Sequence, residues 1–91
     1  MKLDFNETNI LVQVLGELER NPKATINKMA LISNLYLLRQ NTDERYKSLR
    51  SSISSLALKI ENLSERDINK VREDKENNLI NATICYSLPE S

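Results

Sequence analysis

Residues 42–63 of the chain read TDERYKSLRSSISSLALKIENL, and apolar side chains recur along this stretch at intervals of three and four residues. The recurring residues are Tyr46, Leu49, Ile53, Leu56, Ile60 and Leu63. This spacing places them on one face of an α-helix. The opposite side is basic and rich in hydroxyl groups, because no Asp or Glu occurs from Arg45 through Lys59. We therefore predict a long helix over about 42–63 that packs on a core and exposes a basic face.

Two further helices are predicted before this one. The first covers about 6–20, with Asn6 as its expected N-cap. Its predicted core face consists of Ile10, Leu11, Val14, Leu15 and Leu18. The second covers about 25–39, with Thr25 as its expected cap, and ends at the turn residues 40–43.

The second half of this second helix has more apolar residues than one buried face requires, because residues 31–38 are apolar on nearly all sides. An apolar surface of this kind is typical of a contact between subunits. We therefore expect a homodimer. Its expected interface consists of Leu11, Leu15, Leu31, Tyr36 and Leu37.

The C-terminal third has features of a β-hairpin. Residues 67–72 alternate between polar and apolar side chains, and residues 79–88 are rich in β-branched and aromatic ones. The six residues between Arg72 and Leu79 are polar and end in an Asn-Asn pair, which favours a turn. We predict strands over about 67–73 and 79–88. The expected fold is a single mainly α domain, residues 1–91, with three helices followed by this two-stranded hairpin.

Composition excludes several classes of function. Cys85 is the only cysteine and the chain has no histidine, so one chain cannot form a Cys/His zinc site or an internal disulfide. The histidines and glycine-rich phosphate loops of common enzyme classes are also absent. We expect no metal, no cofactor and no catalysis. No apolar run is long enough for a membrane span, and no secretory signal is recognisable, which indicates a soluble cytoplasmic protein.

The charge balance both opposes and permits nucleic-acid binding. The chain has 13 basic and 13 acidic residues, so its formal net charge is zero. A neutral protein has little non-specific affinity for phosphate. The acid-free stretch from Arg45 to Lys59 nevertheless carries four cations. One basic face on a neutral protein can still bind DNA.

The element order of helix, short extended link, helix, turn, longer helix and hairpin resembles the winged helix-turn-helix superfamily of small bacterial and phage regulators. The resemblance implies that the N-terminal half of the 42–63 helix enters the DNA major groove and that the hairpin touches a neighbouring backbone. The residues implied to contact DNA are Thr42, Arg45, Lys47, Ser48, Arg50, Ser51 and Ser52 in the helix, and Lys70, Arg72 and Lys75 in the wing. The standard turn geometry requires the second helix to break near Ser33. If it does not break, the second and third helices form a longer hairpin.

Two functions fit these features. The first is a dimeric, sequence-specific protein that binds double-stranded DNA, either a transcriptional regulator or a replication or recombination accessory of a phage or mobile element. The alternative is a winged-helix module that binds a protein and no DNA, such as an accessory subunit or a phage-encoded inhibitor of a host complex. Net neutrality and the acidic residues around Lys75 favour the alternative.

Overall fold

The computed structural model describes residues 2–20, 27–41, 43–77 and 85–89. Within these ranges the chain forms five helices: α1 (Phe5–Arg20), α2 (Lys28–Gln40), α3 (Glu44–Lys47), α4 (Arg50–Glu61) and α5 (Glu65–Asn77). The described residues contain no strand longer than one isolated antiparallel bridge, between Lys2 and Ser87. The prediction of a mainly α fold is therefore confirmed.

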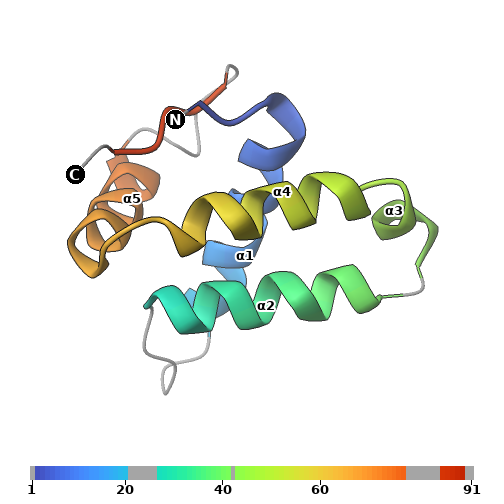
Figure 1. Cartoon of the computed structure of the whole chain (residues 1–91). Helices are drawn as coiled ribbons and strands as arrows, with labels where there is room; N and C mark the ends of the chain where they lie inside the picture. The colour runs from blue at the N-terminus through green and yellow to red at the C-terminus, as the bar shows by residue number, and fades with distance from the viewer. Residues whose placement is uncertain (1, 21–26, 42, 78–84, 90–91) are drawn as a thin grey trace.

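Helices α2 and α4 form an antiparallel hairpin, with α1 crossing it from behind (Figure 1). Helix α2 continues through Ser33 without a break, and the Asn34 side-chain amide donates a hydrogen bond to the Ala30 carbonyl at 3.0 Å. The longer-hairpin alternative is thus the one observed. Two antiparallel helices do not have the steep crossing of a standard DNA-binding helix-turn-helix.

All helices except the short α3 contribute to one core. The buried face predicted for α1 is confirmed, and Leu31 and Leu35 of α2 are fully buried against it. The predicted stripe of the third helix is buried at its C-terminal end, whereas Tyr46 and Leu49 are half-buried. The buried apolar residues are Leu3, Ile10, Leu11, Val14, Leu15, Leu18, Leu31, Leu35, Ile53, Leu56, Ala57, Ile60, Leu63, Ile68, Val71 and Leu88.

The first helix begins earlier than predicted because Asp4, rather than Asn6, caps it. The Asp4 carboxylate accepts a hydrogen bond from the Glu7 backbone N–H at 2.7 Å. The Glu7 carboxylate accepts one in return from the Asp4 N–H at 3.0 Å. This reciprocal pair is a capping box. For α2, the cap is Asn27, whose side chain accepts from the Ala30 N–H at 2.9 Å, while Thr25 lies outside the described residues.

The predicted single helix over 42–63 is two helices. Asp43 caps α3, and the chain then turns at Ser48 and Leu49 before α4 begins. The Tyr46 hydroxyl accepts a hydrogen bond from the Gln13 side chain of α1 at 2.7 Å, which orients α3 toward α1. Leu49 adopts φ −102° and ψ 2°, outside the helical range. Tyr46 and Leu49 therefore have the spacing of a helix face, although a turn separates α3 from α4 at this point.

The predicted first strand of the wing is wrong, because residues 67–73 belong to α5. Ser64 accepts a hydrogen bond from the Asp67 N–H at 3.2 Å and so starts this helix. Ile68 and Val71 are both buried, and their separation of three residues is the spacing of one helix face. The loop predicted after residue 73 is helical through Asn77, and most of the second predicted strand, residues 79–84, lies outside the described residues.

The N-terminal segment before α1 and residues 85–89 lie together near α5 (Figure 1). The Leu3 N–H donates to the Tyr86 carbonyl at 2.7 Å, and the Tyr86 N–H donates to the Thr8 hydroxyl at 3.2 Å. Leu88 is buried in the core. Residues 85–89 therefore pair with the N-terminal segment rather than with residues 67–73.

Candidate anion-binding groove

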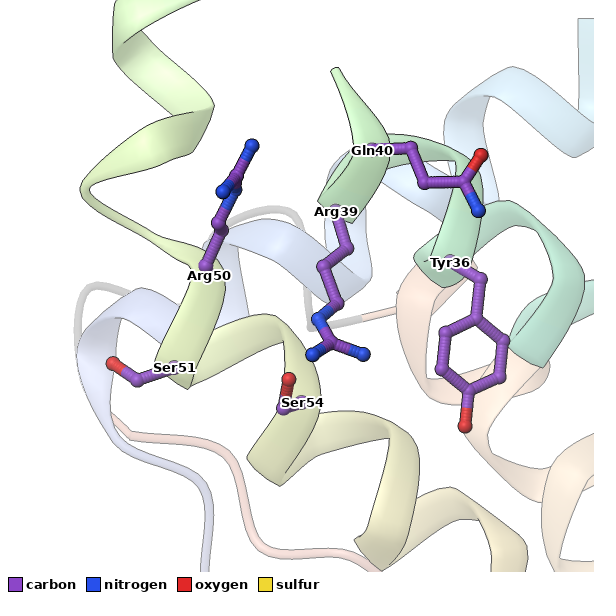
Figure 2. Close-up of a pocket in the computed structure, with 6 residues that line it drawn as sticks. All are labelled: Tyr36, Arg39, Gln40, Arg50, Ser51 and Ser54. Carbon is purple, nitrogen blue, oxygen red and sulfur yellow. The ribbon is translucent and has the colours of Figure 1, made fainter. Parts of the chain in front are cut away.

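A groove of about 550 Å³ lies between the C-terminal end of α2 and the N-terminal half of α4. The antiparallel packing of the two helices brings these segments together. The groove is lined by Tyr36, Arg39, Gln40, Arg50, Ser51 and Ser54. Figure 2 shows the Arg39 side chain reaching toward Ser54, whereas Arg50 points away from Ser54. Each lining side chain can donate a hydrogen bond, and none is a carboxylate.

The two arginines that line this groove have no ion-pair partner among the described residues, and both are exposed. The nearby cations of α3, in contrast, have carboxylate partners. Arg45 lies 3.5 Å from the Asp43 carboxylate, and the Lys47 ammonium lies 3.2 Å from that of Glu44. Residues 39–50 contain four cations and two carboxylates, a surplus of two positive charges. The surplus is located in the groove.

The N-terminus of α4 adds to this positive field. Leu49 is the N-cap residue and provides no side-chain acceptor for the first backbone N–H groups of α4. Uncapped N–H groups and the helix dipole both favour an anion at this end of a helix. Arg50 and Ser51 occupy the first turn of α4 and line the groove. The backbone and the side chains therefore both favour a negatively charged ligand.

The predicted DNA-contacting residues of the third helix are divided among three local structures. Arg45 and Lys47 are exposed on α3, and Ser48 donates a hydrogen bond from its hydroxyl to the Arg45 carbonyl at 3.2 Å in the following turn. Arg50 and Ser51 line the groove. Ser52 is half-buried on the next position of α4 and is not among the lining residues, and Thr42 lies outside the described residues.

The predicted wing residues lie on α5, at the opposite end of α4 from Arg50. The 12 residues of α4 separate the two regions by about 18 Å of helix. Lys70 lies 3.5 Å from the Asp74 carboxylate, and it lines a second groove that also contains Asp67 and Glu73. Lys75 and the exposed Arg72 are also in α5. Cations and acids are mixed on this helix, so it lacks the one-sided charge of the α2–α4 groove.

Lys59, the last cation of the acid-free stretch, forms an ion pair with a buried residue of the same chain. The Lys59 ammonium lies 2.8 Å from the Glu7 carboxylate, which is 3% exposed. The Ser55 hydroxyl donates to the same carboxylate at 3.0 Å. Burial raises the pKa of Glu7, but these hydrogen bonds, with the Asp4 N–H and the Lys59 charge, lower it overall. The basic face predicted from the sequence is therefore shorter than expected.

The predicted dimer interface requires a correction. Leu11, Leu15 and Leu31 are at most 1% exposed and belong to the core of the single chain, so they are not available to a second subunit. Tyr36 and Leu37 are exposed on α2, by 40% and 66%. Only these two of the predicted interface residues remain on the surface.

Arg39, Gln40 and Ser54 are groove residues that the sequence analysis did not identify. Arg39 and Gln40 end the second predicted helix and have no periodic feature that marks them. The one feature that could have identified them is a second helix that continues without a break. An antiparallel hairpin around the 41–49 connection places the residues just before it opposite those just after it.

Among the described residues, no cluster of His, Cys, Asp or Glu has a geometry that could hold a metal ion. No described helix is long and apolar enough to span a lipid bilayer. The chain matches no protein-family model, and neither a curated protein nor a solved structure is significantly similar to it.

Proposed function

We propose that this protein binds double-stranded DNA through the basic end of the α2–α4 hairpin. The observation that carries the proposal is the groove between these helices, where Arg39 and Arg50 have no ion-pair partner among the described residues and no carboxylate lines the walls. Neutralisation of phosphate by such cations supplies most of the non-specific affinity of DNA-binding proteins. No described acid lines the groove, and the nearby Asp43 and Glu44 are paired, so net neutrality does not oppose this local contact.

The surface around the groove offers a second kind of contact. Helix α3 and its turn project Arg45 and Lys47 beside the groove, and both are exposed. Their salt bridges with Asp43 and Glu44 lie at the surface, where such pairs contribute little and break easily. These two cations are therefore available to base edges or to further phosphates. A regulator or a replication or recombination accessory fits this arrangement.

Sequence-specific binding by so small a module is expected to need two copies on two half-sites. The outer surface of α2 is the part of the predicted interface that remains exposed. Met29 and Leu37 on this helix are exposed by 70% and 66%. We propose that a homodimer forms through this surface.

Binding to another protein is the second candidate function, and the same exposed apolar residues favour it. Leu58 of α4 is also 62% exposed. Large exposed apolar side chains on neighbouring helices are typical of a protein contact surface. This candidate predicts a salt-tolerant complex with a protein and no affinity for duplex DNA.

The proposal is tested by fluorescence anisotropy with a labelled duplex of random sequence over a series of salt concentrations. The wild type should bind at low salt, and its affinity should fall steeply as salt rises. An Arg39→Gln/Arg50→Gln double variant should lose most of this binding. The matched control is Lys70→Gln/Arg72→Gln, which removes the same charge from α5 and should bind like the wild type. Absence of binding by the wild type at low salt, or equal loss in both variants, would refute the proposed surface.

A further inference from the structure

We infer that the α2–α4 groove receives a backbone phosphate of the duplex, bound by Arg39 and Ser54 together, and that base edges are contacted only by residues outside the groove. The inference rests on the proposed function and adds which chemical part of the DNA each side chain binds. It assigns Arg39, Gln40 and Ser54 to the phosphate and leaves recognition of bases to α3.

The shape of the site favours a phosphate over a base edge. The groove is a concave surface between two packed helices. In B-DNA the base edges lie at the floor of a major groove about 8.5 Å deep, and a concave protein surface cannot reach them. The phosphates project from the outside of the duplex. An open concave site of this kind can therefore receive a phosphate, whereas the turn that contains α3, at the end of the hairpin, can enter the major groove (Figure 1).

The hydrogen-bonding groups of the groove walls also favour a phosphate. A phosphodiester presents only acceptor oxygens and a negative charge. The groove presents guanidinium, amide and hydroxyl donors without a carboxylate. A base edge combines donors with acceptors at fixed positions, and this acceptor-poor wall would leave several of its donors unsatisfied. The groove matches the phosphate better than it matches a base.

The orientation of the two arginines separates their roles. Arg39 extends across the groove toward Ser54, so its guanidinium and the Ser54 hydroxyl face the same part of the groove, where one phosphate can accept from both (Figure 2). Arg50 points away from Ser54, at the end of the groove nearest the turn. It is placed to contact the next part of the same DNA strand. Removal of Arg39 should therefore weaken binding more than removal of Arg50.

Duplexes of several sequences test the assignment when each is measured with single variants. Arg39→Gln should weaken binding about tenfold, by the same factor on every sequence, and should reduce the salt slope by about one counterion. Arg45→Gln should instead change the ratio of affinities between sequences. Both positions are exposed, and thermal unfolding of each variant verifies that the fold is retained. A sequence-dependent effect of Arg39→Gln would overturn the inference.

Inorganic phosphate is the second probe, because it distinguishes the inference from the proposed function. Phosphate should shift the NMR signals of Arg39, Gln40 and Ser54 in the wild type, and Arg39→Gln should abolish the shifts of Gln40 and Ser54. Phosphate binding without duplex binding would support the anion site and refute the DNA-binding function. Duplex binding that is unaffected by Arg39→Gln, with no phosphate shifts in the groove, would refute the inference and leave DNA binding intact.

Discussion

The Lys59 ammonium lies 2.8 Å from the Glu7 carboxylate and thereby joins α4 to the start of α1. Glu7 is almost fully buried, and Lys59 is 23% exposed. The cations of α4 therefore have two different roles, although they lie in the same acid-free stretch of sequence. Lys59 balances a buried charge within the protein, whereas Arg50, near the other end of the helix, remains available to a ligand.

Replacement of Lys59 should therefore destabilise the fold without affecting DNA binding. Lys59→Met keeps the aliphatic part of the side chain but leaves the Glu7 charge buried without its partner. We expect a loss of about 2–3 kcal/mol in the free energy of unfolding, measured by urea denaturation. Arg50→Met is the matched control on the same helix and should leave stability nearly unchanged. Equal stability of the two variants would contradict the role assigned to Lys59.

The same pair predicts a dependence of stability on pH. The pKa of Glu7 is lowered in the folded protein, so the unfolded chain binds its proton more tightly than the folded chain does. The contribution of Glu7 is thus complete at neutral pH. It is lost as the pH falls from about 4.3, the ordinary pKa of glutamate, through the lower pKa of the folded state. Glu7→Gln should be less stable than the wild type at neutral pH, and the difference should narrow in acid. A difference that stays constant with pH would argue against this linkage.

A hydrogen bond between Tyr86 and Asp74 joins the C-terminal segment to α5. The Tyr86 hydroxyl donates to the Asp74 carboxylate of α5, and burial together with this bond raises the pKa of Tyr86 far above its ordinary value. Tyr86→Phe removes only the hydroxyl and should cost about 1 kcal/mol in the free energy of unfolding. Chemical denaturation of the variant provides the measurement. An unchanged midpoint would mean that this bond does not hold the segment on α5.

The outer surface of α2 should determine the oligomeric state. Leu37 is 66% exposed, so Leu37→Glu places a charge on the surface without disturbing the core. We expect the wild type to sediment as a dimer and the variant as a folded monomer. Sedimentation velocity at several protein concentrations measures the oligomeric state, and circular dichroism verifies that the variant is folded. A wild type that is monomeric at every concentration would exclude the proposed homodimer.

The helical core was predictable because burial repeats with the period of a helix. Residues 10, 11, 14, 15 and 18 form the core face of α1 as their spacing indicates. The hairpin prediction failed because the alternation over residues 67–72 is imperfect. Ile68 and Val71 are three residues apart, with two polar residues between them, which fits a helix face and not the two-residue period of a strand. Ile68 and Val71 are the two buried apolar residues in the described part of α5, so packing and the Ser64 cap decide its structure.

The candidate site was less predictable because it depends on how two helices pair. Arg50 and Ser51 were predicted as binding residues from the acid-free stretch in which they lie, together with the winged-helix resemblance. Arg39 was missed, since its role arises only when α2 remains straight and lies antiparallel to α4. Conversely, the inward-facing role of Lys59 requires a partner 52 residues earlier in the chain. Neither the α2–α4 pairing nor the Lys59–Glu7 contact can be recognised from neighbouring residues in the sequence.

The most direct test of the account is an NMR titration of the isotope-labelled protein with a short DNA duplex at low salt. We predict that the backbone amides of Arg39, Gln40, Ser51 and Ser54 shift most strongly, that those of α3 follow, and that residues 65–74 of α5 remain unchanged. Shifts centred on α5 or on the outer surface of α2 would contradict the assigned groove. A duplex that shifts no residue would contradict DNA binding itself.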